Sequence, residues 1–154
     1  MSSLREMTER WKSFDPVDTT ATLLGENSDQ VIELNKEQLM DGEGKDGLPF
    51  YQYKQRTDEE KEYAKMKNEM NPRPGLGNAD FNLTGAFQSK AYLQINGSDF
   101  TINSEDEKTE GLKKLAKGAP IFGLTEDSKV AAWGDILRNP FVEALSEHTG
   151  CPTQ

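Results

Sequence analysis

The beginning of the chain has a hydrophobic pattern with helical spacing. Apolar side chains recur every three or four residues, at Leu4, Met7, Trp11 and Phe14, and charged side chains fill most positions between them. This stripe predicts a short amphipathic helix, which Pro16 is expected to end. Two interpretations stay open. The stripe packs on the chain's own domain, or it forms an arm that enters a groove on a neighbouring subunit.

A longer helical pattern follows over residues 18–41. Its most regular part is Ser28–Met40, because Gly25 weakens the first half. Gly42 comes directly after the pattern and is typical of a helix end. The sequence therefore predicts the main helix of the domain here, with an apolar face that needs a partner.

The period changes to two farther along the chain. Residues 91–96 and 100–103 alternate between apolar and polar side chains, as strands with one buried face do. Asn96 and Gly97 lie between the runs and are expected to supply the turn of a hairpin. Two strands alone are marginally stable in water. We therefore expect the hairpin to pack on residues 28–40, to gain further strands, or to join a neighbour's sheet.

Other helical segments flank the hairpin. Residues 48–53 are a short aromatic piece that can add a strand. Thr57 and Glu60 form a capping box for a helix over residues 57–70, and Lys67 suits its C-terminal end. This helix has only a thin apolar stripe, so two interpretations stay open: a helix on the surface of the domain, or a mobile excursion from it. The stripe consists of Tyr63, Met66 and Met70.

The C-terminal part is predicted to be helical. Residues 107–117 form one compact helix, and Thr125 caps a second that carries Val130, Trp133 and Leu137 at helical spacing. Asn139-Pro140 is expected to break that helix and to start a last one, which contains Phe141.

The pattern as a whole predicts an α+β fold. A long helix packs on a small curved antiparallel sheet with a central β-hairpin, and additional C-terminal helices and an N-terminal arm complete it. The predicted divisions are an amphipathic arm over residues 1–17, a core domain over 18–138, and a C-terminal helix with a loose tail over 139–154.

Composition adds that the core must be small. Only 34% of the 154 residues are hydrophobic and the mean hydropathy is −0.80, so the chain gains stability by burying surface against a partner. The net charge of −9 repels phosphate, so we expect no specific binding of nucleic acid. No apolar run approaches the roughly 20 residues of a membrane helix, and the N-terminus lacks the apolar core of a signal peptide.

Candidate chemistry is sparse. His148 and Cys151 are the only residues of their types, and both lie near the end of the chain. Glycines and acids at 41–47 suggest a calcium loop, but Asp46 stands where that loop needs glycine. We therefore predict no catalytic residue, no cofactor and no metal site.

Three stretches occur in a set order: VIELNKEQLMDGEGKDGLPFYQY, LTGAFQSKAYLQINGSDFTINS and GAPIFGLTED. Their arrangement resembles the neck and tail-completion proteins of tailed bacteriophages, also called virion morphogenesis proteins. It is similar to the versions in phages of gut Bacteroidetes, including the crAss-like group. The residues that match the family motifs are Leu83, Thr84 and Gly85 before the hairpin, and Pro120, Phe122, Gly123 and Leu124 in the later turn.

The resemblance implies a structural protein of the virion, made in the cytoplasm of the bacterial host. It implies a ring of copies at the head–tail connector, in contact with other neck, portal or tail proteins, and no catalysis. The N-terminal arm and the helices of residues 125–148 are candidates for the two sides of the contact between copies. The candidate interface residues are large and apolar or aromatic: Leu4, Met7, Trp11, Phe14, Tyr92, Trp133 and Phe141.

A second function stays open. The alternative is a small acidic binding protein without catalytic activity that acts in the host cell, for example by mimicking the charge of DNA. Mimicry would need a dense acidic face, whereas lysines such as Lys36, Lys61 and Lys113 are interleaved with the acids.

Overall fold

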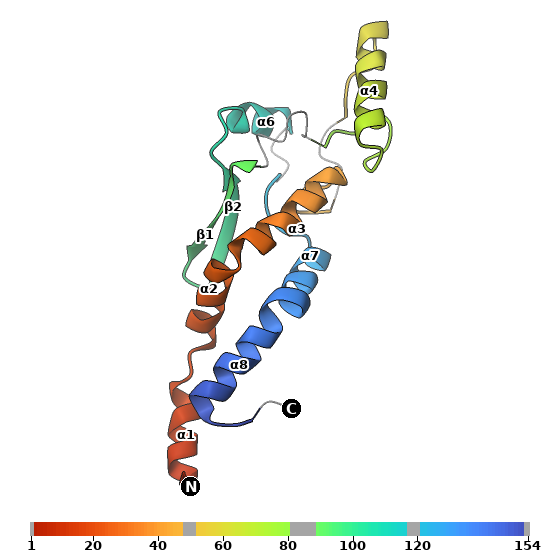
Figure 1. Cartoon of the computed structure of the whole chain (residues 1–154). Coiled ribbons are helices and arrows are strands. Elements are labelled where there is room, and N and C mark those ends of the chain that lie inside the picture. The colour runs from red at the N-terminus through yellow and green to blue at the C-terminus, as the bar shows by residue number, and fades with distance from the viewer. Residues whose placement is uncertain (1, 48–51, 81–88, 117–120, 153–154) are drawn as a thin grey trace.

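The structure is a computed structural model that describes residues 2–47, 52–80, 89–116 and 121–152. In chain order its elements are α1 (Leu4–Ser13), α2 (Pro16–Glu26), α3 (Ser28–Met40), α4 (Asp58–Met70), β1 (Ala91–Asn96), β2 (Asp99–Ser104), α6 (Thr109–Leu115), α7 (Glu126–Ala131), the π-helical η1 (Ala132–Leu137) and α8 (Arg138–Thr149). The described part is an α+β fold with a two-stranded antiparallel sheet, which confirms the predicted class. The molecule is elongated, with α1 at one end, α4 at the other, and the hairpin and α3 between them (Figure 1).

The helix predicted over residues 18–41 is two helices, because the helical backbone is interrupted at Asn27. The backbone N–H and the side-chain Nδ2 of Asn27 both donate to the Leu23 carbonyl oxygen, at 3.0 and 2.8 Å. This side-chain bond competes with a continuous helix and ends α2 where α3 begins. The regular part, Ser28–Met40, is confirmed as α3. Pro16 is the first residue of α2, where its fixed φ suits a helix start.

β1 and β2 form the predicted hairpin. Asn96 pairs with Asp99, so the turn lies one residue later than predicted and its central residues are Gly97 and Ser98. Gly97 has φ 63°, the positive value that tight hairpin turns need at the first central position. Burial alternates along β1, so one face of the hairpin packs on α2 and α3 and the other is exposed.

The core lies around α3 and divides into two clusters. One joins α3 to the hairpin and the C-terminal helices, and the other joins α3 to the end of α6. Their buried members are Val31, Ile102, Leu124 and Ala132 in the first cluster, and Leu39, Ala116 and Ile121 in the second. The predicted packing of the long helix on the hairpin is therefore confirmed.

The C-terminal helices run on through Asn139-Pro140, so the predicted break there is wrong. Thr125 caps α7 as predicted, and its hydroxyl accepts from the Ser128 N–H at 3.2 Å. α7 then passes through η1 into α8, whose third residue is Pro140. A proline ring in an α-helix clashes with the carbonyl four residues earlier. Here that carbonyl belongs to the wider π-helical segment, which relieves the clash.

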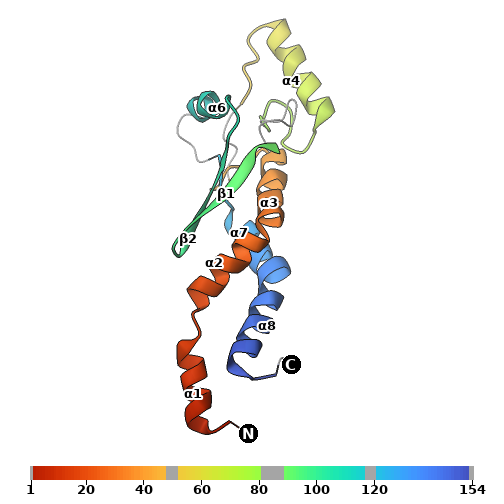
Figure 2. The same ribbon diagram turned by 60° about the vertical axis from the view of Figure 1, so that its left-hand side comes forward.

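α4 stands away from the other helices and the hairpin in both views (Figures 1 and 2). Its capping box forms as predicted: Thr57 Oγ1 accepts from the Glu60 N–H at 3.2 Å, and Glu60 Oε2 accepts from the Thr57 N–H at 3.2 Å. Residues 48–51 of the predicted extra strand lie outside the described residues. Gln52 bridges to Asn78 and not to the hairpin.

Candidate functional site

An aromatic cluster joins α1 to the C-terminal helices. Phe14 contacts the Phe141 ring with 5.7 Å between centroids and the His148 ring with 5.6 Å, and Trp133 contacts Phe141 at 5.3 Å. All three pairs meet edge to face, the arrangement that the ring quadrupoles favour. Phe14 therefore anchors the end of α1 on α8 within one chain.

A hydrogen bond reinforces this contact. Ser13 Oγ lies 2.8 Å from His148 Nε2 and 3.0 Å from the Arg10 carbonyl oxygen. The hydroxyl has one proton, which it donates to the carbonyl, so His148 Nε2 donates to Ser13 Oγ. His148 therefore helps to hold α1 in place. The backbone N–H of Cys151 donates to Thr149 Oγ1, and its thiol is free.

The apolar side chains of α1 beyond the aromatic cluster remain exposed. Leu4 is 83% exposed and Trp11 49%, although Phe14 is half-buried. We call Leu4 and Trp11, which are seven residues apart on α1, the terminal surface. Large apolar side chains grouped at one end of a molecule mark a site of interaction more often than isolated ones do.

The structure places the sequence-predicted interface residues in two regions. α1 carries Leu4, Met7 and Trp11 and leads into Phe14, which meets Phe141 of α8, and Phe141 in turn meets Trp133 of η1. Tyr92 is separate: it lies on the outer face of the hairpin and is 38% exposed.

α1 lies beside the C-terminal end of α8 and extends beyond it (Figure 1). Phe14 docks on α8 of the same chain and brings α1 to that side. That the arm and the C-terminal helices are the two sides of a contact between copies stays a prediction.

The residues of the later family-like motif are structural. Gly123 O accepts from Asn35 Nδ2 and from Gln38 Nε2, both at 2.9 Å. Gln38 Oε1 accepts in turn from the Thr125 N–H at 2.9 Å. These buried amides fix the turn that carries half-buried Phe122 and buried Leu124 onto the core. Leu83, Thr84, Gly85 and Pro120 lie outside the described residues.

A second exposed apolar surface lies on α4. Its stripe faces outward: Tyr63 is 41% exposed, Met66 41% and Met70 57%. The face toward the body carries Ala64 and Lys67, which are 1% and 4% exposed. Lys67 lies in the last turn of α4 as predicted, and its side chain is buried.

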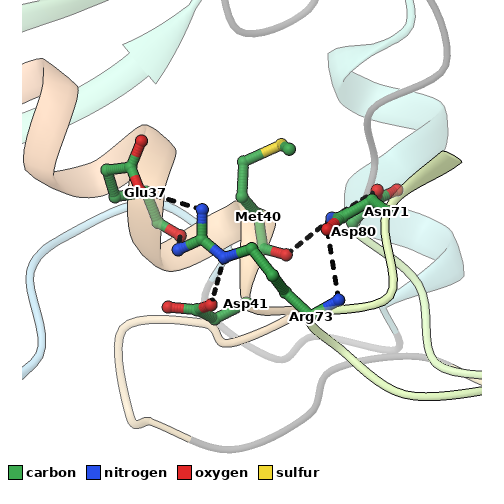
Figure 3. A network of polar contacts seen from close by, with 6 residues as sticks. All are labelled: Glu37, Met40, Asp41, Asn71, Arg73 and Asp80. Carbon is green, nitrogen blue, oxygen red and sulfur yellow. Dashed lines mark hydrogen bonds and ion pairs between the residues drawn. The ribbon is translucent and has the colours of Figure 1, made fainter.

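A buried polar network attaches α4 to the body. Lys67 Nζ lies 2.8 Å from Asp80 Oδ1, and Asp80 Oδ2 accepts from Asn71 Nδ2 at 3.0 Å. The same Asn71 nitrogen donates to the Met40 carbonyl oxygen at the end of α3, at 2.7 Å (Figure 3). Polar groups can hold a helix in this way when each buried charge has partners.

Arg73 closes the network at the surface. Its Nε donates to Asp41 Oδ1 at 2.6 Å and its Nη1 to Glu37 Oε2 at 2.9 Å, both on or next to the end of α3 (Figure 3). These bonds, with Asp41 as the larger cause, raise the pKa of Arg73 above its usual range. This network could not be predicted from the sequence, because its members are far apart in the chain and none follows a periodic pattern.

Within the described residues, no group of three or more histidine, cysteine or acidic side chains is placed to hold a metal ion. In the same part of the chain, no helix combines the length and the apolar character needed to cross a membrane.

Comparison of the chain with protein-family models, with curated proteins and with solved structures gives no match.

Proposed function

We propose that this chain is a structural protein of a tailed-phage virion, which forms an oligomeric ring or adaptor at the head–tail connector and catalyses no reaction. One observation carries the proposal. The elongated molecule exposes two different apolar surfaces at opposite ends, the terminal surface and the α4 stripe of Tyr63, Met66 and Met70 (Figure 1).

Two unlike surfaces suit an adaptor. A subunit between two different layers needs one surface for each layer, and an isologous dimer would use a single self-complementary patch. The terminal surface would meet one neighbouring component of the neck and the α4 stripe another. Each surface is attached to the rest of the molecule. The aromatic cluster attaches α1 to α8, and the Lys67–Asp80 network attaches α4 to the body.

The sequence resemblance agrees with this role. In the later motif, the Gly123 carbonyl oxygen accepts hydrogen bonds from Asn35 and Gln38 of α3, which supports a structural role for this turn. The small core also fits a subunit that is stabilised by assembly.

The experiment is to locate the protein in particles. Purified virions are examined by peptide mass spectrometry and by cryo-electron microscopy of the head–tail junction, and we expect this chain in a ring of density there. Particles that lack the chain, with the protein recovered from infected cells as a monomer bound to a host protein, would overturn the proposal and favour the acidic binding protein.

A further inference from the structure

The two strands of the hairpin have open outer edges. Glu105 N–H donates to the Lys90 carbonyl oxygen at 3.1 Å, and this bond sets the alternation of the antiparallel ladder. The backbone groups of Leu93 and Ile95 on β1, and of Ile102 on β2, then point away from the partner strand. No hydrogen bond to these outward groups comes from the part of the chain that the structure describes.

Neither strand carries, among its own residues, the features that usually protect an exposed edge. Edge strands of natural proteins are commonly blocked by charged side chains, proline or a bulge. The strands read AYLQIN and DFTINS, so Asp99 beside the turn is their one charged residue, although 29% of the chain is charged. Their register is continuous from Ala91–Ser104 to Asn96–Asp99, without a bulge.

The edge of β2 has space beside it. A groove of about 290 Å³ is lined by residues 98–102 on one side and by the turn of residues 122–124 on the other, and the side chains of Lys45 and Lys129 also line it. Consecutive residues of β2 line it, and consecutive residues point to opposite faces of a sheet, so the groove follows the edge and not one face. An added strand could lie there.

The two edges fit each other. A β1 strand placed beside β2 of another copy keeps the antiparallel order, and its alternation puts apolar side chains on the covered face and polar side chains on the exposed face. Pairing of β1 with β1 would leave both β2 edges open and would stop at two copies. Pairing of β1 with β2 can be repeated by every copy.

We propose that the β1 edge of one copy pairs with the β2 edge of the next, so that the hairpins form one continuous antiparallel sheet within the ring. This inference rests on the proposed function, because it supplies the contact between copies, while the two ends of the molecule contact other components. The sheet then presents a polar outer face on which Asp99 is the one charged residue of each hairpin's strands. That face also contains Tyr92, Gln94, Asn96, Thr101 and Asn103.

Disulfide trapping in the purified full chain tests the pairing. In a Cys151→Ser background, Gln94→Cys and Thr101→Cys each place a thiol on the exposed face of one strand. We expect the oxidised mixture of the two variants to give roughly tenfold more covalent dimer than either variant alone, because a disulfide needs Cα atoms within about 7 Å. Equal cross-linking within single variants would indicate pairing of like edges and would overturn the proposal, as would a mixture without covalent dimer.

A blocking variant gives an independent readout. Gln94→Lys adds a charge to the β1 edge without touching the core, and we expect it to weaken self-association in sedimentation by about tenfold or more. Gln94→Thr, which keeps the edge uncharged, is the matched control and should associate like the native chain. Association unchanged by the lysine variant would contradict the pairing.

The two proposals can fail separately. If virions contain the chain in the neck but disulfide trapping fails, this inference alone is overturned. If trapping succeeds but virions lack the chain, only the proposed function is overturned.

Discussion

At the residue scale, the buried ion pair between Lys67 and Asp80 is the feature on which the position of α4 depends. The side chains are 4% and 3% exposed. Lys67→Met leaves the Asp80 carboxylate buried without its cation, and we expect a loss of roughly 3–5 kcal/mol in the docking of α4, because an uncompensated buried charge is costly. Hydrogen exchange of the α4 amides measures this loss directly.

The control for that variant is Lys61→Met. Lys61 also pairs with an aspartate, Asp58, at 3.5 Å, but its side chain is 52% exposed. An exposed ion pair contributes little to stability, so the opening free energy of α4 measured by hydrogen exchange should change by less than about 1 kcal/mol. Equal effects of the two variants would show that the burial of Lys67 does not stabilise the docking of α4.

The capping box of α4 makes the helix sensitive to acid. Hydrogen bonds from the Arg56 and Thr57 backbone N–H groups lower the pKa of Glu60. A carboxylate with a lowered pKa in the folded state stabilises fully above the pKa of the unfolded chain, about 4.3, and this contribution disappears as the pH falls through the folded value. We therefore expect α4 to fray below pH ~4, and Glu60→Gln to remove that part of the pH dependence in a titration followed by NMR.

At the element scale, the hairpin turn depends on one backbone conformation. A Cβ at Gly97 would meet no atom within 4 Å, so only its φ of 63° opposes substitution. We expect Gly97→Ala to lower the free energy of unfolding by about 1–2 kcal/mol, the cost of a left-handed L-residue. Urea unfolding followed by circular dichroism measures the change.

Gly111 offers a matched comparison in a helix. It lies in α6, and a Cβ there also meets nothing within 4 Å. Alanine suits a helix interior better than glycine, so Gly111→Ala should stabilise by about 0.5–1 kcal/mol. If both alanine variants moved stability in the same direction, the turn conformation of Gly97 could not be the cause.

Elements with local determinants could be predicted from the sequence. The caps at Thr57 and Thr125, the helix Ser28–Met40 and the hairpin follow from side chains a few residues apart. The continuous helix through Pro140 could not be predicted, because the π-helical segment that accommodates the proline has no simple sequence pattern. The apolar stripe of α1 could be predicted from its spacing. The contact of α1 with α8 could not, since Phe14 and Phe141 meet only in the folded chain.

At the scale of the whole molecule, the terminal surface is expected to serve assembly and not folding. Leu4 and Trp11 are 83% and 49% exposed. The double variant Leu4→Ser/Trp11→Ser should therefore keep the native melting temperature within a few degrees, while its incorporation into virions falls at least about tenfold, as expected when a large apolar anchor of an interface is removed. Quantitative mass spectrometry of purified particles measures the incorporation.

Lys12→Ser is the control on the same helix, since Lys12 is a largely exposed charge that pairs with Glu9 at 3.8 Å. It should enter virions like the native chain. A terminal-surface variant that entered particles normally would remove this end from the proposed contacts. A variant that melted early would mean that the exposed residues serve the fold.

The polar attachment of α4 has a calorimetric consequence. The buried residues of α4 are Ala64 and Lys67, so its release from the body exposes little apolar area and should leave the heat capacity almost unchanged. A calorimetric scan of temperature would then register mainly the melting of the core formed by α3 and the hairpin. An early release of α4 would pass unseen in the heat trace, yet it would open the helix to a protease at temperatures where the core is intact.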